Sequence, residues 1–180
     1  GPNRGLEIRM LGTPGVFRDG RPVPLPPSRK TRALLAYLAA AERPQRRERL
    51  CEMFWEIPDD PRGALRWSLS KLRQILGDAL DSGHDPVAID TKAVRVDYHR
   101  VRNALSRDLR QASVPELEDL ARLFRGPFLD DLSLPRCPDF EAWRVALAAE
   151  VELMQLRLCR TLIDRLTRDD PERALAHARA

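Results

Sequence analysis

A set of mostly basic side chains in the first half of the chain has the chemistry to bind a nucleic acid. Arginine and lysine reach guanine acceptors or phosphates, while serine and glutamine hydrogen-bond to base edges or to the sugar-phosphate backbone. The candidates are Arg29, Lys30, Arg46, Arg47, Arg62, Arg66, Trp67, Ser70, Lys71, Arg73, Gln74, Lys92 and Arg95. Such residues are also common on solvated surfaces, so the interpretation depends on the elements that hold them.

The distribution of charge also favours the first half as the anion-binding part. The 180 residues include 31 Lys and Arg against 27 Asp and Glu, a formal net charge of +4. Residues 1–100 carry 18 basic and 13 acidic side chains, whereas residues 101–180 carry 13 and 14. A basic balance alone is weak support, because many basic proteins bind no nucleic acid.

Catalytic chemistry has little support in the sequence. His84 precedes Asp85 in a polar loop without a serine or cysteine nucleophile at a strained turn, and His99 and His177 are isolated. No pair of His or Cys residues has metal-ligand spacing, and the early glycines do not form a phosphate loop. We therefore expect no enzyme activity, no metal and no cofactor.

The cellular compartment follows from cysteine usage and from the lack of a long apolar segment. Cys51, Cys137 and Cys159 are odd in number and far apart, which argues against a disulfide framework or a zinc site and favours a reducing cytosol. The longest apolar run, Ala33 to Ala41, is too short to cross a bilayer, and the N-terminus lacks a signal-peptide pattern. These features predict a cytoplasmic protein that does not associate with membranes.

A small antiparallel sheet followed by three helices is predicted at the start of the chain. Leu6, Ile8 and Met10 alternate with polar residues, and Asp19-Gly20 gives a turn signal between two further short strands. Ser28 is the expected N-cap of a first helix that ends near Glu42. The second and third helices are predicted at about Arg47 to Trp55 and at Pro61 to Leu76, the third bounded by Asp60 and Gly77.

The third helix has the pattern of a recognition helix. One face carries the leucines that would bind it to the core, which are Leu65, Leu69, Leu72 and Leu76. The candidate polar residues from Arg62 to Gln74 spread over the other faces, where they would meet the major groove. Trp67 lies opposite the leucines and would either touch thymine methyls or sugar, or pack under the next hairpin.

The other basic residues cluster at places where a DNA backbone could pass. Arg29 and Lys30 stand at the start of the first helix, and Arg46 and Arg47 at the start of the second, where free backbone N–H groups attract phosphate. After a polar loop at 78–86, alternating residues at 87–90 and 94–97 predict a hairpin joined by Thr91-Lys92-Ala93. Lys92 and Arg95 would then belong to a wing that enters the minor groove. The whole order predicts an α+β winged helix-turn-helix with an N-terminal antiparallel sheet, over residues 3–98.

The second half, residues 99–180, is predicted to be all-α and similar to tetratricopeptide arrays. Apolar residues at steps of three and four mark one long helix from about Asp139 to Arg168, and another helix begins after Asp169-Asp170. No clean repeat of fixed period is visible. Gly1-Pro2 looks like the remnant of a cleaved tag, and the uncapped last helix suggests that the natural protein continues.

A series of short motifs runs through both halves of the chain. In the first half they are Leu11-Gly12, Asp19-Gly20-Arg21-Pro22, Ser28-Arg29-Lys30, residues 32–38, Arg47-Glu48-Arg49-Leu50, Phe54-Trp55, Leu65, residues 69–73 and Leu76-Gly77. In the second half they are residues 124–129, Trp143 and residues 170–175. In this order the motifs resemble those of the SARP family of antibiotic regulatory activators. Two positions depart from the family: Arg46 stands where a Ser or Thr N-cap is usual, and Gly63 where Asn is common.

The resemblance implies an OmpR-type winged-helix DNA-binding domain followed by a bacterial transcriptional activation domain, here truncated at its C-terminus. It further implies binding to direct repeats in promoter DNA, with a homodimer as one arrangement on the DNA, and contact with the sigma factor and core subunits of RNA polymerase. Some family members add an ATPase, a phosphopeptide-binding domain or another sensor. The alternative is a helical protein-interaction module of a larger signalling regulator, whose winged helix binds protein rather than DNA.

Overall fold

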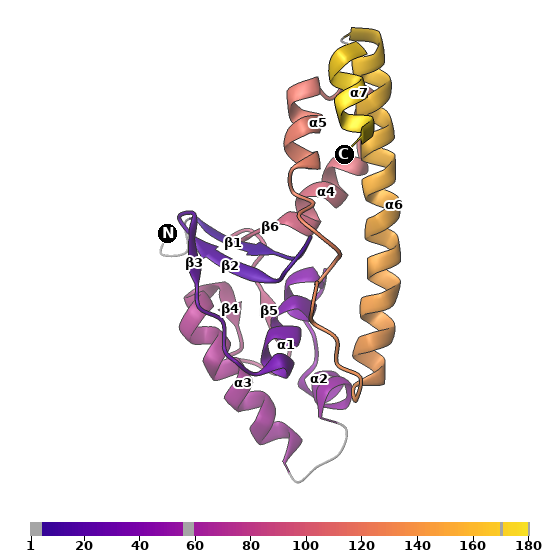
Figure 1. Cartoon of the computed structure of the whole chain (residues 1–180). Helices are drawn as coiled ribbons and strands as arrows, with labels where there is room; N and C mark the ends of the chain where they lie inside the picture. The colour runs from indigo at the N-terminus through magenta and orange to yellow at the C-terminus, as the bar shows by residue number, and fades with distance from the viewer. Residues whose placement is uncertain (1–4, 56–59, 170, 180) are drawn as a thin grey trace.

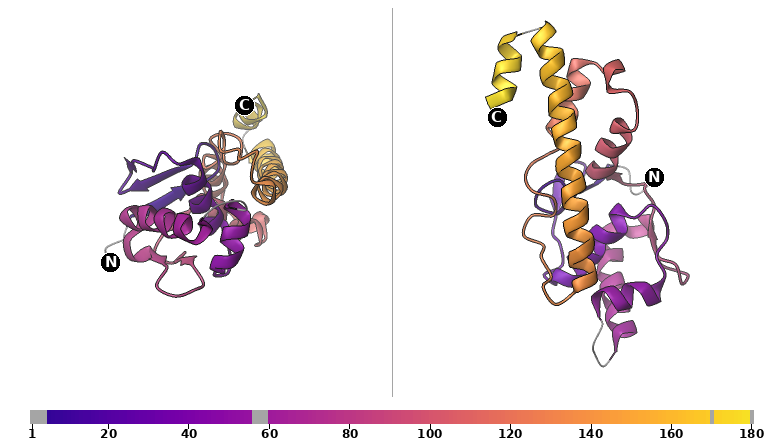
Figure 2. Two further views of the ribbon diagram at one scale, coloured as in Figure 1. Left: turned by 90° about the horizontal axis from the view of Figure 1, so that it is seen from below. Right: turned by 90° about the vertical axis from the view of Figure 1, so that its right-hand side faces the viewer.

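The computed structural model describes residues 5–55, 60–169 and 171–179, so the predicted tag remnant Gly1-Pro2 lies outside the described residues. The fold is α+β, with a small sheet and several helices. Figure 1 shows the N-terminal sheet and the first helices of the chain in the lower part, with further helices above them. The longest helix, α6 (Pro138–Asp169), runs past both parts, as Figure 2 also shows.

The predicted N-terminal antiparallel sheet is confirmed, and it gains a fourth strand. Strands β1 (Leu6–Arg9), β2 (Gly15–Arg18) and β3 (Arg21–Val23) pair in antiparallel order. Asp19 and Gly20 both have positive φ, 52° and 81°, which suits the tight turn between β2 and β3. The fourth strand, β6 (Arg95–Val96), pairs with β1 in parallel and brings a distant segment to the sheet.

The three predicted helices are confirmed as α1 (Arg29–Ala40), α2 (Arg47–Phe54) and α3 (Pro61–Leu76). Their apolar faces meet in the core, where Leu34, Leu50 and Leu72 are completely buried. At the start of α1 the Ser28 hydroxyl accepts a hydrogen bond from the Thr31 backbone N–H at 3.2 Å. At the start of α2, Arg46 provides no side-chain cap, as expected from its lack of an acceptor.

The hairpin predicted between residues 87–90 and 94–97 is wrong. A two-stranded sheet pairs β4 (Leu80–Asp81) with β5 (Ala88–Ile89), whereas β6 joins β1 in the other sheet. The segment predicted as a polar loop at 78–86 therefore contains a strand, preceded by a short 3₁₀ turn, η1 (Gly77–Ala79). The predicted hairpin does not form because β5 pairs with β4 instead of β6. In this pairing Ile89 lies opposite Leu80, and both side chains are buried.

The second half consists of helices in the described residues, as predicted. They are α4 (Asp97–Leu105), a 3₁₀ turn η2 (Leu109–Gln111), α5 (Val114–Ala121), α6 and α7 (Pro171–Arg179). A complete capping box starts α5, because Ser113 and Glu116 bond each other's backbone N–H groups. The α6 stripe points inward as predicted, with Phe140, Leu158 and Leu162 almost fully buried.

The two halves share one hydrophobic core, which continues across the boundary predicted near residues 97–100. The Asp97 carboxylate is buried and accepts hydrogen bonds from the backbone N–H groups of Met10 and Leu11 at 2.8 and 3.0 Å. Burial raises the pKa of this carboxyl, although these bonds and the nearby Arg125 act to lower it. These contacts, like the shared core, cross the predicted domain boundary. The boundary near residues 97–100 therefore stays a prediction.

A segment between α5 and α6 fastens the second half to the end of β1. The backbone N–H groups of Arg125 and Leu129 donate to the carbonyls of Leu11 and Met10 at 2.7 and 3.0 Å. Gly12 has a φ of +143° and lies against this segment, so a side chain there would be strained and would crowd Arg125. The contact holds the helices of the second half in a fixed position relative to the sheet.

Aromatic rings form a second junction between the halves. Trp143 on α6 lies 5.1 Å from Tyr37 of α1 and 5.5 Å from Phe140, measured between ring centroids. Phe140 in turn lies 5.4 Å from Phe54 of α2. This junction is on the face of α1 and α2 that α6 covers. No helix within the described residues is long and apolar enough to span a membrane.

Candidate nucleic-acid interface

Helix α3 is fixed at both ends by local chemistry. The Asp60 carboxylate accepts from the Gly63 backbone N–H at 2.9 Å, and Pro61 occupies the first turn, where its missing N–H is no loss. Gly77 ends the helix with a φ of 57°, and Arg18 of β2 donates to the Ile75 carbonyl at 2.9 Å. The helix therefore has a defined length and a fixed position on the sheet.

The inner face of α3 is bound to the core by its leucines and by one polar contact. All four residues of the predicted stripe are buried: Leu65, Leu69, Leu72 and Leu76. Beside them, the hydroxyls of Ser68 and Thr31 lie 2.9 Å apart and satisfy each other inside the protein. This pairing joins α3 to α1 and fixes which face of α3 turns outward.

The outer face of α3 carries a row of polar and cationic side chains. Exposed side chains on it are those of Arg62, Arg66, Trp67, Ser70, Arg73 and Gln74, and Lys71 is half-buried. Arg66, Ser70 and Gln74 follow one another at steps of four, so they form one line along the helix. Together these groups offer hydrogen-bond donors and acceptors of the kinds that read base edges and phosphates.

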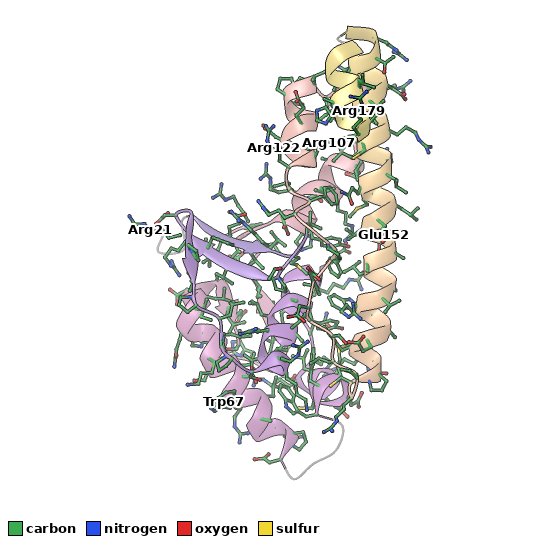
Figure 3. All side chains as sticks on the ribbon, viewed as in Figure 1. Arg21, Trp67, Arg107, Arg122, Glu152 and Arg179 are labelled. Carbon is green, nitrogen blue, oxygen red and sulfur yellow. The ribbon has the colours of Figure 1, made fainter. Side chains whose placement is uncertain are left out.

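Trp67 lies in the open rather than under a hairpin. Its side chain is 51% exposed, and Figure 3 shows it on the outer side of α3. The Lys71 ammonium lies 5.4 Å from the centroid of the indole ring, within the range of a cation–π contact. From the sequence, this ring was expected either to be exposed for contact with DNA or to pack under the next hairpin. In the structure the ring is exposed.

A groove of about 600 Å³ lies at the surface between α2 and α3. Three arginines lie along it, Arg47, Arg62 and Arg66, together with the acidic residues Glu48, Glu52 and Asp85. Its floor includes Cys51 and Leu65, and burial raises the pKa of the Cys51 thiol against the opposing influence of Arg62 and Arg47. The three arginines are the groups in this groove that could bind a phosphate.

Two candidate phosphate ligands also hold the loop between β4 and β5. The Arg47 guanidinium donates to the Ser82 carbonyl at 2.5 Å, and its backbone N–H donates to the Asp85 carboxylate at 3.1 Å. Arg73 of α3 donates to the Ser82 hydroxyl. The loop is thus clamped to α2 and α3, and each arginine keeps only part of its donor capacity for a ligand.

Arg29 has a structural contact that its sequence context did not indicate. Its guanidinium donates to the carbonyls of Asp131 and Ser133, at 3.0 and 3.1 Å, in the segment that leads into α6. Lys30 beside it is half-buried, and Arg46 at the start of α2 is exposed. The start of α1 therefore contributes to the junction between the halves, while the start of α2 remains open to solvent.

Lys92 and Arg95 lie apart from α3, since the predicted hairpin does not form. Both line a separate pocket with Arg43 and Arg100, bounded by the end of α1, β5, β6 and α4. No residue of α3 lines this pocket. Of the predicted site residues, the structure brings together those of α2 and α3, and it places Lys92 and Arg95 in a second basic region.

Comparison with known proteins supports the fold. No protein-family model matches the chain, and no curated protein matches it. Among solved structures, it is similar to Mycobacterium tuberculosis EmbR in complex with a low-affinity phosphopeptide, with a TM-score of 0.66 and 24% sequence identity. The match covers 97% of this chain and 51% of the EmbR chain, so this chain spans about half the length of EmbR. The chain therefore shares the fold of the part of EmbR that it matches.

Proposed function

We propose that the chain is the DNA-binding and adjoining helical part of a SARP-type transcriptional activator. The observation that carries this proposal is the division of α3 into two faces. Its leucines are buried, while Arg66, Ser70 and Gln74 form an exposed line beside Arg62 and Arg73. A helix of this kind fits the major groove, where arginine reads guanine and glutamine reads adenine.

In this proposal the first half is an OmpR-type winged helix-turn-helix. Helix α2 precedes α3 and presents the exposed Arg46 at its start, where backbone N–H groups favour a phosphate. The β4–β5 hairpin takes the place of the wing that the sequence suggested at 87–97, and the clamp by Arg47 and Arg73 orients it. The likeness to EmbR supports the order of these elements.

The second half would be a tetratricopeptide-like activation domain. Helices α5 and α7 lie beside the upper part of α6, in the manner of stacked helical hairpins (Figures 1 and 2). We propose that this part contacts the sigma factor and core subunits of RNA polymerase while the first part binds direct repeats in a promoter, with a homodimer on the DNA as one arrangement. We further propose a cytoplasmic, non-catalytic role without metal or cofactor.

A second candidate function is recognition of another protein, by the winged helix and by the exposed face of α6. The exposed ring of Trp67 favours it, as do three exposed apolar side chains of α6, those of Val145, Leu153 and Leu156, which are 57%, 68% and 61% exposed. A protein partner would bury these groups and would depend weakly on salt. The two functions are therefore separable by the salt dependence of binding.

Affinity for duplex DNA at several salt concentrations tests the proposal. Each phosphate contact should contribute about −0.9 to the slope of log affinity against log salt. Arg66→Ala should weaken binding to a selected site by about 1–3 kcal/mol and binding to random duplex much less. The matched control is Arg107→Ala, an exposed arginine that lies far from α3 (Figure 3).

If the chain bound duplex with no dependence on salt, or if Arg107→Ala weakened binding as much as Arg66→Ala, α3 would not be the DNA-contacting element. A salt-independent complex with another protein would favour the second candidate.

A further inference from the structure

A second basic pocket lies at the boundary between the two halves of the chain. It has a volume of about 580 Å³ and is formed by the end of α1, strands β5 and β6, and helix α4. This volume is within the range of small-molecule binding sites in proteins. Because α4 belongs to the second half, the pocket has walls from both parts.

The charges around this pocket are strongly unequal. Five basic side chains line it, those of Arg43, Lys92, Arg95, Arg100 and Arg102, against two acidic ones, those of Glu42 and Asp90. Glu42 pairs with Arg102, and Asp90 accepts from the backbone N–H of Lys92 at 2.9 Å. Each of the two carboxylates thus interacts with a neighbouring residue of the pocket wall.

Among the described residues, the other four cations have no ion-pair partner of their own, so positive charge exceeds negative charge around the pocket. In the part of the chain that the structure describes, the side chains of Arg43, Lys92, Arg95 and Arg100 form no hydrogen bond or ion pair. Like charges that converge on one concave site repel one another and raise the local concentration of anions.

The shape and chemistry of the lining indicate which anion would fit. The inner wall is apolar and includes Ile89, Val94 and Val96, which strengthens the field of the cations at the mouth. The imidazole of His99 lies on the same wall and is held by the Ala39 carbonyl at 2.7 Å. Arginine guanidinium groups match the oxygens of a phosphate with paired hydrogen bonds better than a point charge does.

We propose that this pocket binds phosphate groups. They would belong either to a small phosphorylated molecule or to the backbone of a duplex that passes beyond α3. In both cases the phosphate would touch β6 and α4 together, and so would link the DNA-contacting half to the helical half. The site is independent of the α3 interface, because α3 contributes none of its lining.

Pyrophosphate and a labelled duplex serve as the two probes. Titration calorimetry measures pyrophosphate binding, and fluorescence anisotropy measures the duplex, for the whole chain and for the double variant Arg95→Ala/Arg100→Ala. Both side chains are exposed, so their removal leaves the core intact, which thermal unfolding checks. Arg107→Ala is the control for the loss of one arginine elsewhere.

We expect saturable pyrophosphate binding that the double variant weakens about tenfold or more, and that the control leaves unchanged. If duplex affinity is then the same in wild type and double variant, the source is a small phosphorylated molecule. If duplex affinity falls and pyrophosphate displaces the duplex, the source is the DNA backbone. The proposal is overturned if the double variant changes neither measurement. If the chain bound no duplex at all, the proposed function would fail. The pyrophosphate titration would still show whether this pocket binds phosphate groups.

Discussion

Replacing Phe140 with alanine should destabilise both halves of the chain together. Phe140 is completely buried, and its ring contacts Phe54 of α2 and Trp143 of α6 at centroid distances of 5.4 and 5.5 Å. Removal of a buried phenylalanine costs about 3–5 kcal/mol, since the cavity is added to the lost transfer free energy. For a chain of this size, that loss lowers the melting temperature by about 6–20 °C.

Calorimetry and denaturant unfolding would measure the effect, with Leu153→Ala as the control. Leu153 lies on the same helix but is 68% exposed, so its replacement should cost less than about 0.5 kcal/mol. Because the buried residues form one core, we expect a single transition that moves as a whole in Phe140→Ala. The reasoning is refuted if Phe140→Ala costs no more than Leu153→Ala. It is also refuted if two transitions are seen and only one of them moves.

Three further substitutions test local contacts. Asp60→Ala removes the N-cap of α3 and should cost about 1 kcal/mol in denaturant unfolding, whereas Asp60→Asn should preserve most of the stability; equal losses would argue against the cap. Thr31→Val leaves the buried Ser68 hydroxyl without its partner and should cost about 1–3 kcal/mol, part of which Thr31→Val/Ser68→Ala should restore; a double variant less stable than the single would contradict the pairing. Arg47→Ala removes the guanidinium contact to the Ser82 carbonyl, so amide hydrogens of the loop at 82–86 should exchange faster while those of α3 stay protected; unchanged exchange in the loop would show that this contact does not restrain it.

The helices of the fold could be predicted from sequence because their signals are local. Ser28, Asp60 and Gly77 each act within three or four residues of their own position, so the start of α1 and both ends of α3 follow from residue type. The stripe of α6 likewise depends only on spacing along one helix. These are the elements whose predicted limits agree closely with the structure.

Strand pairing was predicted less well because it depends on distant partners. The alternation near Ile89 and Val96 correctly indicates strands, but nothing nearby shows that Ile89 pairs with Leu80 or that Val96 pairs with Ile8. With two residues each, these strands are too short for their own pattern to choose a partner. The pairing is decided by burial in the folded core.

The candidate site shows the same limit. Residue type predicts that arginines can bind phosphate, but Arg29 and Arg95 look alike in sequence, and only the fold shows that Arg29 is bonded to the segment before α6. Arg100 belongs with Lys92 and Arg95 in the second pocket, although it stands in a predicted helical segment. Its proximity to them in sequence was the one available signal.

The fluorescence of Trp67 during titration with duplex DNA tests the central claim most directly. Of the three tryptophans, Trp67 lies on the outer face of α3 and is 51% exposed, while Trp55 and Trp143 are half-buried. If α3 meets the groove, duplex should change the emission of the wild-type chain, because the environment of this indole changes on binding. Trp67→Phe should still bind a labelled duplex but lose that change in emission. The account is contradicted if Trp67→Phe keeps the full change, or if the wild-type chain binds the duplex and its emission stays the same.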